Sequence, residues 1–231
     1  MMIEWVGLDA DDTLWHSENG FVEITARYVD LVHPYAGGLS RGDIERHLTR
    51  TERANLAVFG YGVKAFTLSM IESAATVTEG LVPATTLRDV QRLGKELLQR
   101  PVELLDGVVE AVAAISETHR LLLITKGDLL HQETKVAESG LAPHFHSIEI
   151  VSEKDPAAYR QVLRQHDIDP SVFLMVGNSV KSDVLPVIEI GGRAVHIPYQ
   201  YLWDAEHAEH DGSVPELTSI KELPSWLAAQ I

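Results

Sequence analysis

The sequence predicts an α/β protein with a Rossmann-like parallel sheet of five or more strands, flanked by helices and interrupted by an inserted helical bundle. Short apolar runs alternate with segments of helical periodicity over much of the chain, which is the pattern of βαβ units. The runs are almost continuously apolar, as strands are when both faces of a sheet are covered. Residues 17–100, in contrast, contain helical patterns only.

The strands of the predicted sheet are short and end next to polar residues. Residues 3–9 (IEWVGLD) form the first and end at an acid. The other predicted strands are 120–125, 147–151, 172–177 and 193–197. Helical patterns separate the later strands, at about 107–118, 129–139, 157–166 and 181–190. Because a helix returns the chain between these strands, we expect the strands to run parallel.

The inserted segment contains four predicted helices. They are residues 21–33, 40–59, 63–77 and 83–99. Glycine and proline residues at 37–38, 60–62 and 80–83 separate them, where turns are expected. We therefore predict an α/β core of residues 1–16 and 101–231 and a helical domain of residues 17–100. A polar loop at 204–216 and a short C-terminal helix are expected to complete the core.

Composition limits the classes of function. The chain has 231 residues, 45% of them hydrophobic, which is enough for a substantial core. Acids outnumber bases 34 to 19 and give a formal charge of -15, which argues against a nucleic-acid or anionic membrane partner. The chain contains no cysteine, which excludes disulfides and thiolate chemistry and fits a cytoplasmic protein. We expect no signal peptide and no membrane span, and the sequence does not indicate an oligomeric state.

Chemistry is expected where the strands end, because ligands of open parallel sheets bind beyond the carboxyl ends of the strands. The residues that follow the first four strands are carboxylates, an amide, hydroxyls and lysines. They are Asp9, Asp11, Thr125, Lys126, Lys154, Asn178, Ser179 and Asp183. Oxygen ligands and lysines at one edge suit a phosphoryl group together with a hard divalent cation.

Four of these segments resemble the motifs of the haloacid dehalogenase (HAD) superfamily phosphatases. The first family motif, Asp-x-Asp-x-Thr, is matched by Asp9 to Thr13, and the second, a Ser or Thr that ends a strand, is matched by Thr125. The third, a Lys before a helix, is matched by Lys154, and the acidic fourth by residues 177–183 (GNSVKSD). The motifs occur in the family's order over most of the chain. The resemblance also implies that the inserted helices are the family's α-helical cap of the first insertion type.

The resemblance implies a role for each matched residue. Asp9 is expected to attack phosphorus and form an aspartyl-phosphate, and Asp11 to act as general acid and then as general base. Thr125 and Lys154 are expected to bind the phosphoryl group, with Lys154 also neutralising charge on Asp9. The implied cofactor is Mg²⁺, held by Asp9, the Asp11 carbonyl and Asp183. Asn178 stands where many relatives have Asp, so it is expected to bind the metal without adding charge.

Other residues have a weaker claim to a role. Lys126 and Lys181 also follow strands and are rivals for the lysine that binds the phosphoryl group. We rank Lys154 first for this role, Lys126 second and Lys181 third. Asp155-Pro156 reads as the start of a helix, which leaves Lys154 in the preceding loop, free to reach inward. Asp12 is interpreted as a turn-stabilising acid outside the chemistry.

The predicted cap and the polar loop add further candidates. Tyr61 and Lys64, in and after the turn between two helices of the cap, are candidate substrate contacts, although packing or solvation is the commoner role. His16, just past the first motif, is a candidate for the hinge of the cap, although a surface histidine is the commoner case. His207 and His210 have a spacing that zinc sites use, but they lack further obvious ligands.

The leading hypothesis is a Mg²⁺-dependent phosphohydrolase that acts on a small phosphorylated metabolite, with the cap closing over the substrate. A phosphomutase on the same scaffold is the first alternative. A dehalogenase is disfavoured by Asp11, because it needs the nucleophile but no phosphoryl acid/base. A catalytically silent binding protein is disfavoured by the intact motif residues.

Overall fold

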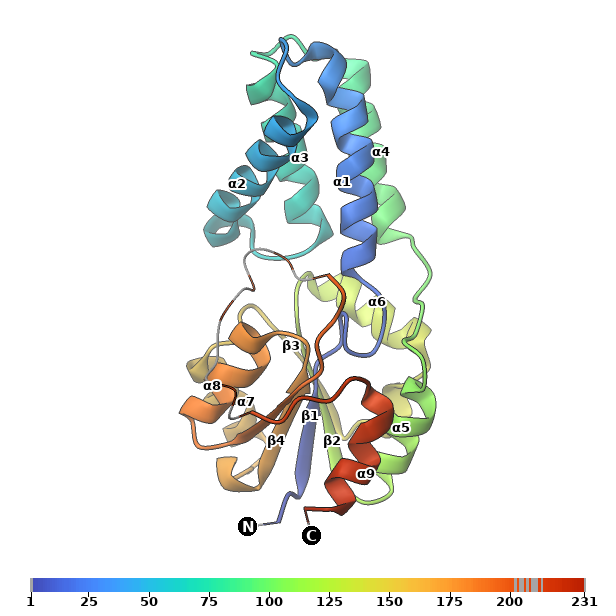
Figure 1. The fold of residues 1–231 in the computed structure, drawn as a ribbon, viewed down its shortest axis with the longest axis vertical. Coiled ribbons are helices and arrows are strands. Elements are labelled where there is room, and N and C mark those ends of the chain that lie inside the picture. Colours follow the sequence, from blue (N-terminus) through green and yellow to red (C-terminus); the bar gives the residue numbers. More distant parts are fainter. Residues whose placement is uncertain are drawn as a thin grey trace. The chain divides into compact units, whose positions relative to one another are not determined.

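The computed structural model describes residues 2–201, 203, 206, 208, 212 and 214–230. The chain divides into two compact units. The first consists of Met1–Glu18 and Val102–Ile231, and the second of Asn19–Pro101. The first unit contains a sheet and the second consists of helices (Figure 1).

The sheet of the first unit has five strands, all parallel, in the order β3-β2-β1-β4-β5. The strands are β1 (Trp5–Leu8), β2 (Arg120–Lys126), β3 (Ser147–Val151), β4 (Phe173–Gly177) and β5 (Arg193–His196). The predicted α/β fold class is therefore confirmed, and each predicted strand is present. β1 lies at the centre, with Leu8 opposite Leu123 of β2 and Val176 of β4.

Helices cover both faces of this sheet (Figure 1). On one face, α5 (Val108–Ser116), α6 (Leu129–Ser139) and α9 (Leu223–Ala228) pack against side chains such as Val6 and Leu8. On the other face, α7 (Pro156–Gln165) and α8 (Leu185–Glu189) pack against side chains such as Leu122 and Phe173. Burial on two sides explains the continuous apolar runs in the sequence.

Short helical turns connect several of these elements. They are η2 (Ala142–His144), η3 (Pro170–Val172), η4 (Val180–Val184) and η6 (Ile220–Glu222). Of these, η4 is a π-helical turn that directly follows β4. Such turns are rare and occur frequently at functional sites.

The second unit contains α2 (Arg41–Phe59), α3 (Val63–Val77), α4 (Ala84–Leu98) and nearly all of α1 (Glu18–Val32), with the short η1 (His33–Tyr35) after α1. The four helices share one buried cluster that includes Ile24, Met70 and Val90. Ser40 begins α2 with a capping box, in which Ser40 and Asp43 each accept from the other's backbone N–H. Among the described residues, no helix has both the length and the apolarity that a membrane span requires.

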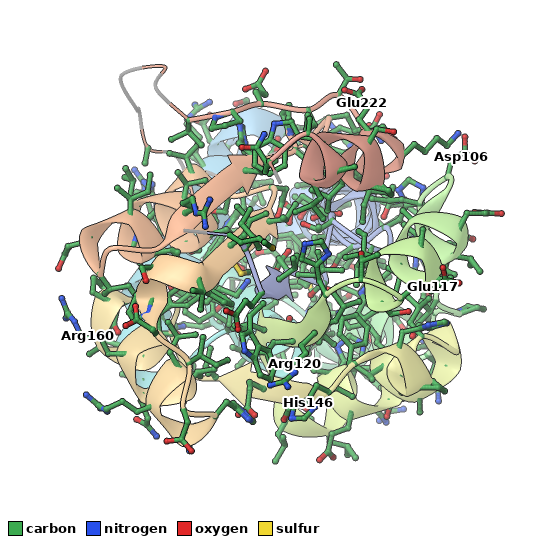
Figure 2. All side chains as sticks on the ribbon, turned by 90° about the horizontal axis from the view of Figure 1, so that it is seen from below. Asp106, Glu117, Arg120, His146, Arg160 and Glu222 are labelled. Atoms are coloured by element: carbon green, nitrogen blue, oxygen red, sulfur yellow. The ribbon has the colours of Figure 1, made fainter. Side chains whose placement is uncertain are left out.

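The two edges of the sheet differ in chemistry. The edge where the strands begin is shown from below in Figure 2, and there Arg120 and His146 both contact the Trp5 ring. Arg120 Cζ lies 5.2 Å from the centre of that ring, and the centre of the His146 ring lies 5.0 Å from it. At the opposite edge, Asp9 follows the central strand β1. The strand order reverses at β1, and such switch points are where open α/β sheets bind ligands.

Candidate active site

A tight turn after β1 positions the first group of acids. The Ala10 carbonyl accepts the N–H groups of Thr13, Leu14 and Trp15, at 2.8 to 3.3 Å. The Asp9 N–H donates to the Val176 carbonyl at 2.9 Å, so the start of this turn stays attached to β4. Asp9 is buried, with 6% of its surface exposed.

Lys154 lies between two buried carboxylates. Its Nζ donates to Asp9 Oδ1 and, at 2.7 Å, to Asp183 Oδ1. The Asp155 side chain accepts the Ala158 N–H at 2.7 Å and Pro156 is the first residue of α7, so the helix begins immediately after the lysine. This is the helix start expected from the sequence, and it directs Lys154 inward.

Asp183 is held from two directions. Its Oδ1 accepts from Lys154, and its Oδ2 accepts the Ser179 N–H at 3.0 Å. The π-helical turn η4 folds Asp183 back against Gly177, where an added Cβ would lie 2.2 Å from Asp183 Oδ2. Gly177 therefore makes room for this carboxylate. These contacts suit Asp183 to fixing Lys154, and its expected role as a direct metal ligand stays a prediction.

Burial shifts the protonation of this ion group. Burial raises the pKa of Asp9 to about 6, Lys154 opposes the rise, and the nearby Asp183 adds to it. Burial alone would lower the pKa of Lys154, but the carboxylates of Asp183 and Asp9 outweigh it, and the pKa lies well above the ordinary value. Lys154 is therefore a permanent cation here, and Asp9 is ionised near neutral pH.

Asp11 has a different set of partners. Its Oδ1 accepts from Trp15 Nε1 at 2.6 Å and from Lys135 Nζ at 2.5 Å, and its Oδ2 accepts from Gln132 Nε2 at 3.0 Å. Burial would raise the pKa of Asp11, but Lys135 and the hydrogen bonds outweigh it and lower the pKa. The two acids of the first motif are therefore in opposite environments.

Thr125 ends β2 at the same edge and is buried. Its Oγ1 accepts from Gln132 Nε2 at 3.1 Å. A hydroxyl that accepts in this way keeps its own proton for another acceptor, such as a phosphoryl oxygen. Gln132 therefore joins Thr125 to Asp11.

Asn178 faces the oxygens of the turn after β1. Its amide group has one atom 3.3 Å from both Asp9 Oδ2 and the Asp11 carbonyl oxygen. If this atom is the amide nitrogen, it donates to both oxygens. If the amide is turned so that its oxygen lies there, that oxygen, Asp9 Oδ2 and the Asp11 carbonyl oxygen form a group of three acceptors. Three convergent oxygens fit a hard cation such as Mg²⁺. No group of three His, Asp or Glu side chains in the described part of the chain forms a metal cluster, so this set combines a carboxylate, a backbone carbonyl and an amide.

Lys126 is engaged by a carboxylate that the motifs did not indicate. Its Nζ donates to Glu206 at 2.6 Å and to Ser182 Oγ at 2.9 Å. Glu206 is buried and also accepts from the hydroxyls of Ser179 and Ser182. Burial would raise the pKa of Glu206, but Lys126 and the hydroxyls lower it. Lys126 thus lies near the candidate site but is paired with Glu206.

Asp12 lies outside the ion group. It adopts a left-handed conformation with φ +62°, and its Oδ1 accepts the N–H groups of Ser17 and Glu18 at 2.8 and 3.1 Å. This fits the turn-stabilising role expected from the sequence. Burial and the neighbouring Asp11 raise the pKa of Asp12 to about 8.

Four further sequence candidates lie in the described part of the chain. Tyr61 lies in the turn between α2 and α3 and Lys64 near the start of α3, both in the second unit. Lys181 is on η4 with an exposed side chain. His16 shares a 2.6 Å hydrogen bond with the Tyr199 hydroxyl. His207 and His210 lie outside the described residues.

The sequence reasoning missed Gln132, Lys135 and Glu206. A signal for the first existed: Gln132 and Val136 are one turn apart on α6 and both are buried, so a polar residue occupies an inward position of an amphipathic helix. Glu206 had no such signal, because it lies in a polar loop whose pairing with Lys126, 80 residues away, depends on the fold.

Comparisons with known proteins agree with this architecture. A haloacid dehalogenase-like family hydrolase from Xanthomonas campestris is 42% identical, with a TM-score of 0.87, covering 99% of this chain and 91% of that one. A 2-haloacid dehalogenase from Pseudomonas syringae pv. Tomato is 20% identical (TM-score 0.65, all of both chains), and a protein from Haemophilus somnus described as a predicted phosphoglycolate phosphatase is 16% identical (TM-score 0.68, 98% of both). For the last two, the likeness shows a shared fold and nothing about activity.

A comparison with curated proteins found no match. The profile of the haloacid dehalogenase-like hydrolases, in contrast, matches residues 3–191, which is most of the chain. The resemblance inferred from the four motifs is confirmed: the chain belongs to the haloacid dehalogenase-like hydrolase family.

Proposed function

We propose that the protein is a Mg²⁺-dependent phosphohydrolase that removes phosphate from a small phosphorylated metabolite through an aspartyl-phosphate intermediate. The proposal depends most on Asp11, a second ionisable carboxyl group held beside the candidate nucleophile and joined to Thr125 through Gln132. An alkoxide leaving from a phosphate ester needs a proton, whereas a halide leaves from carbon without one. A second acid therefore favours phosphate esters over haloacids.

The candidate nucleophile is Asp9 Oδ1. Asp9 Oδ2 accepts from Thr13 at 2.9 Å and faces Asn178, so the carboxylate is fixed at one oxygen while the other lies beside Lys154. Attack on phosphorus forms the Asp9–phosphorus bond and breaks the bond to the leaving oxygen. Lys154 balances charge on Asp9 and on the phosphoryl group, and the Thr125 hydroxyl donates to a phosphoryl oxygen.

Asp11 completes both halves of the reaction. In the first half it gives a proton to the leaving oxygen, and because Lys135 and the hydrogen bonds lower its pKa, it must first take up that proton, for example from the incoming phosphate monoester. In the second half it takes a proton from the water that attacks phosphorus. The bond between phosphorus and the Asp9 oxygen then breaks, which releases phosphate and restores the Asp9 carboxylate. The same group returns to its starting state, so no further reactant is needed.

The residues that would hold Mg²⁺ are Asp9, Asn178 and the Asp11 carbonyl. With the Asn178 amide turned so that its oxygen faces the other two, the three oxygens would offer one negative charge and two neutral dipoles. When bound, the ion would shield the carboxylate of Asp9 from an anionic substrate. Asp183 supports this group by fixing Lys154.

Phosphate release tests the proposal. Purified protein is incubated with p-nitrophenyl phosphate and a panel of phosphorylated metabolites, with MgCl₂ or with EDTA, and free phosphate is measured. We expect release that requires Mg²⁺ and that Asp9→Asn abolishes.

Two other outcomes would replace the proposal. Isomerised sugar phosphate without free phosphate would indicate a phosphomutase, and halide release from a 2-haloacid would indicate a dehalogenase. Full phosphatase activity in Asp9→Asn would refute the mechanism while keeping the reaction class.

A further inference from the structure

One face of α6 contacts the carboxylate of Asp11. Gln132 and Lys135 are three residues apart, so they lie on the same face of this helix. Gln132 is buried, with 2% of its surface exposed, and the Lys135 side chain is 12% exposed. A lysine this covered needs a partner, and its partner is Asp11 Oδ1.

We propose that Gln132 and Lys135 are positioning residues for Asp11, which orient its carboxyl group toward the leaving oxygen and tie it to the phosphate-binding Thr125. The inference rests on the proposed function. It assigns to α6 a part in the chemistry although neither side chain belongs to the four motifs.

The hydrogen bonds to Asp11 are unequal. Oδ1 has two donors, Trp15 and Lys135, at 2.6 and 2.5 Å, whereas Oδ2 has one, Gln132, at 3.0 Å. Oδ2 therefore keeps a lone pair for proton transfer. Lys135 and Trp15 fix the rotation of the carboxyl group by holding the other oxygen.

Gln132 sets the second constraint. Its Nε2 lies 3.0 Å from Asp11 Oδ2, 3.1 Å from Thr125 Oγ1 and 2.8 Å from the Lys126 carbonyl, so these three acceptors share the two hydrogens of the amide nitrogen. The amide thus links the end of β2 to the turn after β1. This link holds the carboxyl group of Asp11 at a fixed distance from the Thr125 hydroxyl. A fixed distance matters because small displacements of reacting groups lower the reaction rate strongly.

Positioning of a general acid has a specific kinetic signature. Phenol is a much weaker acid than p-nitrophenol, so its anion is the poorer leaving group. Cleavage of phenyl phosphate therefore depends more on a proton donor than cleavage of p-nitrophenyl phosphate, which has nearly the same shape. The quantity kcat/KM includes steps only through departure of the leaving group and therefore omits the later hydrolysis of the aspartyl-phosphate. A mispositioned Asp11 should lower kcat/KM for phenyl phosphate more.

The experiment compares Lys135→Met and Gln132→Leu with wild type on both aryl phosphates. We expect kcat/KM to fall about tenfold more for phenyl phosphate than for p-nitrophenyl phosphate, and Lys135→Arg to recover part of the difference. Glu133→Met, at an exposed position of the same helix, is the matched control and should leave the ratio unchanged. Equal losses on both substrates, or none, would overturn the proposal.

A second measurement does not depend on activity. The fall in Tm caused by Lys135→Met is measured in wild type and in Asp11→Asn. If Lys135 holds Asp11, the fall should shrink to about half or less in the second background. Additive changes in Tm would overturn the contact. If wild type hydrolyses neither aryl phosphate, the proposed function fails, and this cycle still decides whether Lys135 holds Asp11.

Discussion

Replacing Asp9 by Asn should abolish activity and at the same time stabilise the metal-free protein at neutral pH. Asp9 and Asp183 are two buried carboxylates that share the single cation of Lys154. An amide at position 9 keeps one oxygen as an acceptor for Lys154 and turns its NH2 group toward Thr13, whose hydroxyl can accept, and it removes the surplus negative charge. Lys154 then forms a simple pair with Asp183.

The size of the effect follows from the pKa of Asp9. Burial raises this pKa from 3.8 to about 6, against the pull of Lys154. Each pH unit between the two values corresponds to about 1.4 kcal/mol. Ionised Asp9 therefore lowers the free energy of unfolding by about 3 kcal/mol above pH 6, and the substitution should recover much of this amount.

The sign gives a pH window. A raised folded-state pKa means that the protonated carboxyl group is the form that the folded protein prefers. No penalty exists below pH 3.8, where both states are protonated. The penalty grows as the pH rises toward about 6, where the folded protein also ionises, and is constant above that value. At pH 4.5 it should amount to only about 1 kcal/mol.

Urea unfolding in EDTA measures this difference. Wild type and Asp9→Asn are compared at pH 7.5 and pH 4.5, and the stabilisation should be about 3 kcal/mol at the first and about 1 kcal/mol at the second. Addition of Mg²⁺ at pH 7.5 should stabilise wild type more than the variant. A variant that is less stable than wild type at pH 7.5, or an effect that is the same at both pH values, would refute the reasoning.

Three further outcomes are expected. Lys154→Met leaves two buried carboxylates without a cation and should cost about 3–5 kcal/mol, which urea unfolding at pH 7.5 would measure; a loss below about 1 kcal/mol would contradict it. Asp12→Asn keeps the oxygen that caps the turn, so phosphate release should stay near the wild-type rate, and a complete loss would place Asp12 in the chemistry. Glu206→Leu removes the nearer carboxylate partner of Lys126 and the acceptor of the Ser179 and Ser182 hydroxyls, and should cost about 2–4 kcal/mol; an unchanged Tm would show that Glu206 does not hold this cluster.

Most of the fold could be predicted because local pattern and tertiary structure agree. The predicted helices at 63–77 and 129–139 and the strand at 147–151 match α3, α6 and β3 in both bounds. The strand order could not be read from the sequence, since pairing of β1 with β4 joins residues that are about 170 positions apart. The sequence also gave no sign of the π-helical η4, which replaces the first turn of the predicted helix at 181–190.

The site was predictable where motif and strand end coincide. Asp9, Lys154 and Asp183 form one ion group. Lys154 precedes the start of α7, which Asp155 and Pro156 predict in the sequence. The roles of the oxygens were not predictable, because they depend on which side chain reaches which. Asp183 turned toward Lys154 and Ser179, which left Asn178 facing the nucleophile.

The neutral side chain of Asn178 is consistent with the charge of this group. Asp9 and Asp183 together exceed Lys154 by one negative charge, and the raised pKa of Asp9 shows that even this surplus is unfavourable when buried. A carboxylate at position 178 would face Asp9 Oδ2 and double the surplus. Asn178→Asp should therefore bind Mg²⁺ more tightly in calorimetry and be less stable in EDTA, because the added charge helps only when a cation is present. Unchanged affinity would separate Asn178 from the metal, and unchanged stability in EDTA would show that the site tolerates charge more readily than the pKa of Asp9 implies.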